Sequence, residues 1–381
     1  MMIRMLLLLF PLGCALADEP WQWLEDADES NEIAVLLMGD TNLQGREHPP
    51  DAYRHVRATL LDADIRFANL EVALAGHSKD PLVDDIPHKT WMHSEPDQVS
   101  ALTSVEMSGV GVANNVNYPW QAVMRSLEVL DDAGIPHVGG GRNLDAAHTP
   151  LIVAAKTTKV GFLQYAATVF PFNHAATKDR PGIAQIEVHT AYQAPPNLDK
   201  PGQPPIVLTW PDDSSLARMQ DDIRRLADVV DVVVVSYHWG VSNTIEPVSY
   251  QSDVGRAAID AGADLVFGHG PHEYQRIEMH RGKPIFHSLG QFVFDDILRL
   301  GKHREGLLAR ALIRDGELVA VSLLPSWLDD NNDVRLEHPA SGKGLELYHR
   351  LLMVNGDDGV PVRVEGNEIV VSGIGTRPIT E

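Results

Sequence analysis

The run from Val229 to Ser236 limits the fold of this chain more than any other segment. Apart from Asp231 and its final serine it is continuous valine, as in strands that other elements cover on both faces. Five shorter apolar runs predict further strands: Ile33–Met38, Ala63–Ala68, Met107–Ala113, Ile135–Val138 and Leu265–Phe267. Three segments between them are typical of helices: Tyr53–Leu61, Trp120–Ala133 and Tyr250–Ala261. This alternation predicts a layered α/β fold.

Turn residues divide the rest of the chain without marking a linker between domains. Prolines and glycines gather between Ala194 and Pro211, which predicts an extended excursion within the domain. Three hairpins are expected about Arg281-Gly282, Asp315-Gly316 and Glu365-Gly366-Asn367, with a helix over Lys343–Met353. We therefore expect one domain over residues 33–355, followed by a hairpin and tail at 356–381.

The N-terminus predicts export. Residues 1–17 combine Arg4, an apolar run and the small residues Ala15-Leu16-Ala17, the pattern of a cleaved signal peptide, and an acidic leader follows at 18–32. Cleavage would remove Cys14, the single cysteine, and with it any disulfide, thiolate nucleophile or cysteine metal site. Lipidation of Cys14 is the alternative, but Pro11 stands where such a signal prefers leucine. We expect a periplasmic or secreted protein that is not integral to the membrane.

The charge balance argues against a nucleic-acid partner. The chain has 31 Lys and Arg against 53 Asp and Glu, a net charge of −22, whereas phosphate backbones require clustered basic residues. An anionic ligand would therefore need bound metal or local arginines to attract it. Arg46 and Arg276 are the candidates nearest to the expected site.

Polar residues follow the predicted strands at the points where these strands end. In open α/β sheets, ligands bind at the carboxyl edge, where the loops converge. Carboxylates, amides and imidazoles are ligands for zinc, manganese, iron or magnesium, and two such ions can generate hydroxide and bind an oxyanion. Five residues have this placement: Asp40, Glu71, Asn115, His238 and His269.

Each of these residues also has a purely structural interpretation. Asp40 and Asn115 could cap helices or turns, and His238 could be a hydrogen-bonded core histidine. Glu71 could pair with Arg66. Their joint placement is what favours a single site.

His269 and His272 have a spacing that suits metal ligands, although a solvated loop is the alternative.

Other short motifs exclude several classes of enzyme. The segment Gly109–Asn114 begins like a dinucleotide-binding loop but ends in asparagine, and a zinc-protease motif fails because Arg276 stands where its second histidine belongs. The sequence contains neither a Walker loop nor a G-x-S-x-G elbow, which excludes nucleoside triphosphatases and serine hydrolases of those types.

Seven short segments follow one another along the chain: Gly39-Asp40, Asn69-Leu70-Glu71, Ala113-Asn114-Asn115, Ser236–Gly240, Gly262-Ala263-Asp264, Gly268–His272 and Ser288–Phe292. In this order they resemble the CapA family of capsule-synthesis and poly-γ-glutamate-associated proteins, and the resemblance spans Ile33–Asp295. It implies a calcineurin-like metallophosphatase fold, a four-layer sandwich of two β-sheets flanked by helices. It also implies a role in anionic polymer synthesis or export outside the membrane.

The resemblance also implies a set of metal ligands. These are Asp40, Glu71, Asn115, His238 and His272, with Glu71 bridging two ions and His269 a further candidate. Three positions depart from the family pattern: Val116 stands where the family has a leaving-group-protonating histidine, Gly270 where many relatives carry histidine, and Gln291 where asparagine is frequent. No catalytic residue is therefore assigned, and His269 or a water is left as the proton donor.

Three functions follow from this pattern. The first is a metal-dependent hydrolase or transferase acting on poly-γ-glutamate or another envelope polymer, with one or two divalent ions. The second is an exported phosphoesterase acting on a phosphate ester. The third is a non-catalytic accessory protein of the polymer-synthesis machinery that retains only the architecture of the site. Val116 favours the third, and the retained ligands favour the first two.

Overall fold

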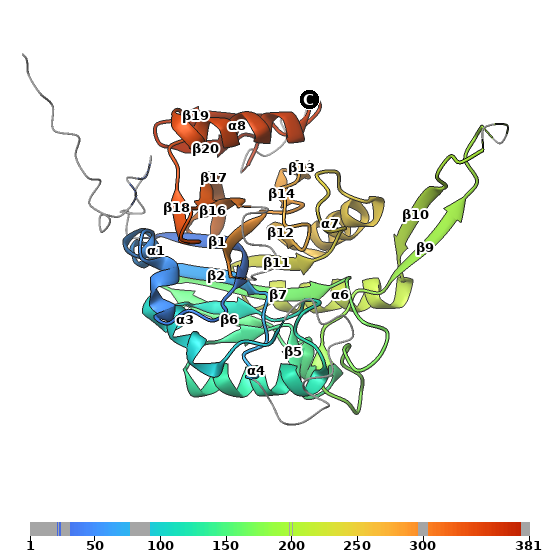
Figure 1. Cartoon of the computed structure of the whole chain (residues 1–381), viewed down its shortest axis with the longest axis horizontal. Coiled ribbons are helices and arrows are strands. Elements are labelled where there is room, and N and C mark those ends of the chain that lie inside the picture. The colour runs from blue at the N-terminus through green and yellow to red at the C-terminus, as the bar shows by residue number, and fades with distance from the viewer. Residues whose placement is uncertain are drawn as a thin grey trace, which may run out of the picture.

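A computed structural model describes residues 21, 23, 31–76, 92–197, 199, 201–295 and 304–374 (Figure 1). The expected signal peptide, Cys14 and most of the acidic leader lie outside the described residues. The predicted layered α/β fold is confirmed, because two large sheets are packed face to face and carry helices on their outer faces.

The larger sheet has ten strands and runs in the order β19-β20-β17-β16-β1-β2-β3-β4. β15 and β18 extend it by pairing with β1 and β17. Strands β1 to β4 are parallel, so their carboxyl ends lie at the same edge. The bounds are β1 Glu32–Asn42, β2 Ile65–Leu70, β3 Gly109–Gly111, β4 His137–Val138, β15 Gln291–Phe294, β16 Glu305–Arg314, β17 Glu317–Leu328, β18 Val334–Leu336, β19 Val362–Glu365 and β20 Glu368–Val371.

The smaller sheet has six strands in the order β13-β14-β12-β11-β7-β6. Its central strands β7, β11, β12 and β14 are parallel. Two further pairs, β5 with β8 and β9 with β10, form small separate ribbons. The bounds are β5 Gly140–Gly141, β6 Leu151–Ala155, β7 Thr158–Ala166, β8 Gly182–Ile183, β9 Val188–Gln193, β10 Ile206–Pro211, β11 Val232–His238, β12 Leu265–His269, β13 Ile277–His280 and β14 Lys283–Phe286.

Helices cover the outer face of each sheet. Apolar residues of α1, α3 and α4 pack on the ten-stranded sheet, and those of α6 and α7 pack on the six-stranded sheet. Within the described residues, no helix is long and apolar enough to cross a bilayer. The bounds are η1 Pro49–Tyr53, α1 Arg57–Asp62, η2 Pro96–Val99, α3 Ser100–Ser104, α4 Trp120–Asp132, α5 Leu144–Ala147, α6 Asp213–Ala227, α7 Ser249–Ala261 and α8 Gly342–Asn355.

Aromatic side chains from both sheets meet in the central core. Phe67 of β2 stacks on Phe162 of β7 with ring centroids 4.6 Å apart, and its ring meets that of Phe267 of β12 edge-on at 5.9 Å. All three side chains are fully buried. This contact fixes the distance between the two sheets next to the strand ends that carry the polar residues.

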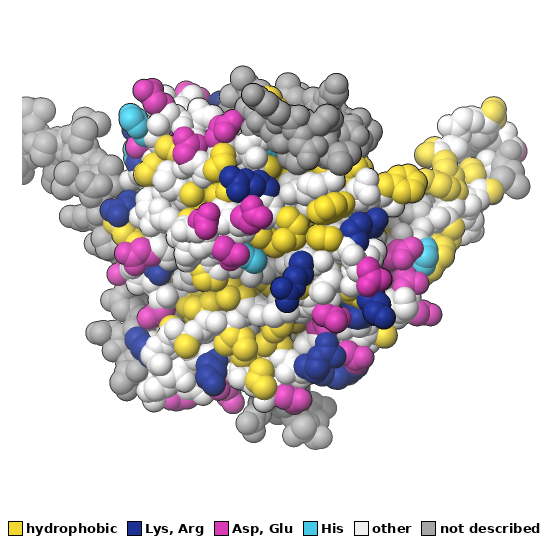
Figure 2. Space-filling model, turned by 90° about the horizontal axis from the view of Figure 1, so that it is seen from below, with side chains coloured by type: hydrophobic (Ala, Val, Ile, Leu, Met, Phe, Trp, Pro, Cys, Tyr) yellow, Lys and Arg dark blue, Asp and Glu magenta, His cyan; other side chains and the backbone are white. Residues whose placement is uncertain are grey.

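Several predicted elements differ from the structure in their bounds. The helix expected over Tyr53–Leu61 is split into η1 and α1, and the strand expected over Met107–Ala113 shortens to β3. The last residues of the proline-rich segment form β10, which pairs with the preceding β9 in a ribbon that extends as an arm from the body (Figure 1). Apolar side chains line this arm in Figure 2, and Tyr192, Val207 and Trp210 are among its exposed residues.

The core contact between the sheets gives a first prediction. Phe67→Ala should lower the free energy of unfolding by about 3–5 kcal/mol, because it leaves a cavity between two sheets that cannot close over it. Phe172→Ala is the matched control, since that ring is 75% exposed, and should change stability by no more than about 0.5 kcal/mol. Urea unfolding of both variants measures the difference, and equal losses would contradict this account of the core.

Candidate metal site

Two carboxylates lie at the carboxyl edge of the ten-stranded sheet. Asp40 is near the end of β1, and Glu71 follows the last residue of the parallel neighbour β2. Gly39 allows this geometry, because a Cβ there would lie 2.2 Å from the carbonyl oxygen of Gly290. That close approach lets the Asp40 backbone N–H donate to the Gly290 carbonyl at 2.9 Å. The backbone of β1 is thereby fixed next to the Asp40 side chain.

Three histidines reach the same place from the six-stranded sheet. His238 and His269 are the last residues of β11 and β12 and lie opposite each other in the parallel register. His272 follows after Gly270 and Pro271, and its own φ of 59° turns the chain back toward the sheet. The two sheets therefore present their polar strand ends to each other.

The five side chains form one buried cluster. His272 Nδ1 lies 3.1 Å from Asp40 Oδ2, and His269 Nδ1 lies 3.5 Å from Asp40 Oδ1. Glu71 Oε1 lies 3.6 Å from His238 Nε2 and 3.7 Å from His272 Nε2. Asp40, Glu71 and His272 each offer a ligand atom within 4.8 Å of the others. All five residues are at most 3% exposed.

The sixth predicted ligand, Asn115, is not joined to this cluster by the contacts of the described residues. Its Oδ1 is buried and has no hydrogen-bond partner there. Its neighbour Asn114 instead donates to the Leu70 carbonyl at 2.8 Å and to Asn69 Oδ1 at 3.1 Å. Asn114 therefore holds this loop on β2, and the Asn115 amide oxygen is left without a bond.

The purely structural interpretations of Glu71 and His238 do not hold. The Arg66 guanidinium donates to the backbone carbonyls of Leu60 and Ala63, so it is not the partner of Glu71. Neither ring nitrogen of His238 bonds to another described residue. Buried polar atoms without partners are uncommon in folded proteins and require an explanation such as an ion or a water. Carboxylates beside partnerless imidazole nitrogens fit a divalent metal ion.

The protonation states of the cluster also suit a cation. Burial would raise the pKa of Asp40, but the His272 hydrogen bond and the positive charge of the neighbouring histidines when protonated hold it below its usual range. Burial lowers the pKa of His238 and of His269 to about 4, although the Asp40 charge opposes that shift. At neutral pH the Asp40 carboxylate is therefore ionised and the imidazoles of His238 and His269 are neutral, the forms that bind metals.

The backbone at Gly270 leaves no room for a metal-binding side chain. Its φ is +103°, and a Cβ there would lie 2.7 Å from the Trp239 carbonyl oxygen and 3.0 Å from His238 Cε1. A histidine at this position would require a different backbone path. The departure at Gly270 is therefore built into the shape of the loop.

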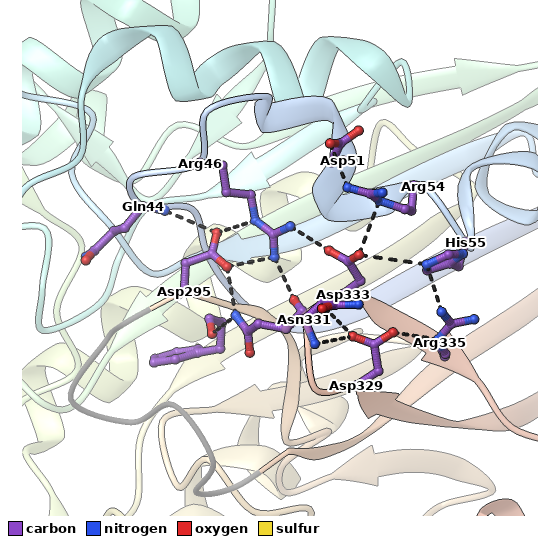
Figure 3. A network of polar contacts seen from close by, with 12 residues as sticks. Gln44, Arg46, Asp51, Arg54, His55, Asp295, Asp329, Asn331, Asp333 and Arg335 are labelled. Atoms are coloured by element: carbon purple, nitrogen blue, oxygen red, sulfur yellow. Dashed lines mark hydrogen bonds and ion pairs between the residues drawn. The ribbon is translucent and has the colours of Figure 1, made fainter.

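The two arginines expected to bind substrate lie outside the cluster. Arg46 donates from Nε and Nη2 to the Asp295 carboxylate at 2.7 Å each and from Nη1 to Asp333 at 2.8 Å (Figure 3). Arg276 lines a separate cavity of about 520 Å³ between β13 and the C-terminal hairpin. A substrate role for Arg46 is not supported, because each of its guanidinium nitrogens already donates to an acceptor.

Buried histidines give a second prediction, for stability against pH. Burial lowers the pKa of His174 to about 3 and those of His238 and His269 to about 4, against 6.5 for the free side chain. Below pH 6.5 the unfolded chain binds protons that the folded chain does not. Stability should therefore be full above pH 6.5 and fall as the pH drops toward 4, by up to about 1.4 kcal/mol per pH unit for each histidine.

Urea unfolding of the metal-free protein at pH 7.0 and pH 5.0 measures this loss. His174→Gln provides the control, because it removes a titrating group outside the cluster, where His174 donates to the Asn114 carbonyl at 3.1 Å. This variant should lose less stability between the two pH values than the natural chain. Equal stability of the natural chain at both values would refute the assignment of neutral buried histidines.

Comparison with known proteins places this chain in a family. The model of a family described as bacterial capsule synthesis protein PGA_cap matches residues 23–296. A probable polyglutamine synthesis accessory protein of Mycobacterium tuberculosis is 29% identical over 274 residues, which cover 69% of this chain and 65% of the relative. The matched part therefore spans slightly less than two thirds of that relative.

Two Bacillus proteins are also similar to the chain. The capsule biosynthesis protein CapA of Bacillus anthracis is 23% identical over 311 residues, covering 78% of this chain and 68% of the relative. The PGA biosynthesis protein CapA of Bacillus subtilis is 28% identical over 210 residues, covering 54% of this chain and 47% of the relative. The match to the family model, residues 23–296, includes all five residues of the cluster.

Proposed function

This chain belongs to the PGA_cap family of bacterial capsule synthesis proteins, and from that premise we propose that it is an exported accessory protein of capsule or poly-γ-glutamate synthesis with a metal-dependent hydrolytic site. The relatives' names support the polymer, and the expected signal peptide at residues 1–17 supports export. One or two divalent ions, of zinc, manganese, iron or magnesium, complete the site. The ligand is an anionic envelope polymer, and the polymer-synthesis machinery is the partner.

The observation that carries this proposal is the buried cluster of Asp40, Glu71 and His272. Two carboxylates removed from water are costly unless a cation or several donors compensate them. Glu71 Oε1 lies within 4 Å of both His238 and His272, so it is the carboxylate shared by both histidines. A divalent ion bound there supplies Lewis acidity and a water of lowered pKa. Asp40 and the histidines fix the position of the ion and balance its positive charge.

The metal also explains how a negatively charged protein binds an anionic polymer. The chain carries a net charge of −22, so its average surface repels a polyanion such as poly-γ-glutamate. A buried cation changes the local sign of the potential where the two sheets meet. An exported metallophosphoesterase would use the same charge to hold a phosphate ester, and only a substrate screen separates these two activities.

One observation favours a second function, a non-catalytic accessory protein. Val116 is buried beside Asn115 in the loop after β3, at the position where the family resemblance places a protonating imidazole. An apolar side chain there can neither donate nor accept a proton. In this alternative the cluster binds metal but supports assembly or polymer binding without turnover.

Metal content provides the third prediction. Glu71→Ala and His238→Ala should each strongly reduce the metal bound per chain, measured by elemental analysis of the purified protein. His148→Ala is the matched control, because His148 is also buried beside a carboxylate, with its Nδ1 2.6 Å from Asp222, but lies on α5's C-terminal side away from the cluster. Its metal content should stay unchanged. Added metal should also raise the melting temperature of the natural chain but not of the two site variants.

Unchanged stoichiometry in both site variants would refute the metal assignment. Loss of metal in His148→Ala as well would mean that general destabilisation, and not ligand removal, reduces binding.

Val116 provides the fourth prediction, which separates enzyme from accessory protein. A protonating imidazole contributes about 10²- to 10⁴-fold to rate. Any hydrolysis by the natural chain should therefore favour aryl esters, whose leaving groups need little protonation. Val116→His should raise turnover of alkyl phosphates more than turnover of aryl phosphates, measured side by side on the metal-loaded protein.

An unchanged ratio of alkyl to aryl turnover would mean that another group already supplies the proton. If neither protein hydrolyses any phosphate ester or glutamyl amide with metal bound, the non-catalytic function becomes the better proposal.

A further inference from the structure

A chain of side-chain amides lies beneath the cluster and ends on Asp40. Gln164 Nε2 donates to Asn69 Oδ1 at 2.9 Å, and Asn69 Nδ2 donates to Asp40 Oδ1 at 2.9 Å. Asn114 Nδ2 donates to the same oxygen of Asn69 at 3.1 Å. All four residues are at most 1% exposed, so bulk water does not compete for these bonds.

Two backbone donors fix the direction of this amide chain. The Ala113 N–H donates to Gln164 Oε1 at 2.7 Å, so the NH₂ group of Gln164 must face Asn69. The Asn117 N–H donates to Asn114 Oδ1 at 3.1 Å, so the NH₂ group of Asn114 must also face Asn69. Asn69 therefore has to present its oxygen to both amides and its own NH₂ group to Asp40.

Gly111, in the glycine-rich segment after Ser108, makes room for the Gln164 side chain. A Cβ on Gly111 would lie 2.2 Å from the Gln164 amide carbon, so only glycine lets this side chain cross from β7 over β3. This segment begins like a dinucleotide-binding loop in the sequence, but it serves here as the floor on which Gln164 lies. A buried polar residue near the end of β7 thus links the two sheets.

The same amide also reaches the histidine side of the cluster. Gln164 Nε2 lies 3.4 Å from Ser236 Oγ, and Ser236 Oγ lies 3.0 Å from His269 Nε2. The ring nitrogen of His269 that faces the cluster is therefore Nδ1. One glutamine supports residues from both sheets.

We propose that Asn69 and Gln164 are positioning residues of the metal site, an inference that rests on the proposed function. Asn69 holds Asp40 Oδ1 with a donor of fixed direction, so Asp40 Oδ2 stays directed at His272 Nδ1, 3.1 Å away. Gln164 fixes the orientation of Asn69. Neither amide contacts the cation, and both keep the carboxylate in one orientation for it. Loss of such supporting hydrogen bonds typically weakens metal affinity about 10- to 100-fold.

Metal titration of full-length variants tests this inference, with Mn²⁺ alone as the probe in isothermal titration calorimetry. Asn69→Leu should weaken Mn²⁺ binding at least about 10-fold. Gln164→Met should weaken it less, because the second anchor through Asn114 remains. Asn355→Leu is the matched control: Asn355 is a buried amide that accepts the Ile277 N–H at 2.9 Å, remote from Asp40, so its loss should destabilise the fold and leave Mn²⁺ affinity unchanged.

The outcomes separate this inference from the proposed function. Equal Mn²⁺ affinity in Asn69→Leu and the natural chain would overturn the positioning role while leaving the metal site in place. Equal weakening by Asn69→Leu and Asn355→Leu would also overturn it, because general destabilisation would explain both.

If the natural chain binds none of the four proposed ions, manganese, zinc, iron or magnesium, the proposed metal site fails and crystal structures decide the inference. The Asn69→Leu structure should then show the Asp40 carboxylate rotated away from His272. An Asp40 side chain that keeps its orientation in that variant would overturn the positioning role.

Discussion

Two carboxylates buried against three imidazoles are the interaction on which the rest of this structure depends. Asp40 and Glu71 come from one sheet and His238, His269 and His272 from the other, and none is more than 3% exposed. Burying such charges costs several kcal/mol per ion unless they are paired and hydrogen-bonded. Both sheets must therefore end their strands at the same place, and the aromatic core between them fixes the separation at which the charges meet.

Much of this arrangement could be predicted from residue pattern. Asp40 and Glu71 lie at the ends of neighbouring parallel strands of one sheet, and His238 and His269 end neighbouring parallel strands of the other, so convergence within each pair followed from topology. That the two pairs face each other depends on how the two sheets pack. Gln164 escaped prediction because a single glutamine within a strand has many structural explanations, and its partner Asn69 gives no periodic signal. The pairing of Arg46 with Asp295 and Asp333 could not be predicted either, since hundreds of residues separate these partners along the chain.

Other differences between pattern and structure arise from tertiary contacts. The proline-rich segment was readily predicted as an excursion, because proline cannot continue a helix or a central strand. That its flanks pair as β9 and β10 depends on register, which the sequence alone does not specify in strands with apolar side chains on both faces. Membership in the capsule-synthesis family places the chain among bacterial capsule synthesis proteins, and a side chain at Gly270 would require a different backbone path.

Anomalous diffraction from crystals soaked in Mn²⁺ or Zn²⁺ tests the central claim most directly, because it locates the ion and needs no substrate. The account predicts an anomalous peak within bonding distance of Asp40, Glu71 and His272, with the His272 ring moved from its direct contact with Asp40 to make room for the ion. A map without a peak at the cluster, in which His272 Nδ1 still lies beside Asp40 Oδ2, would contradict it.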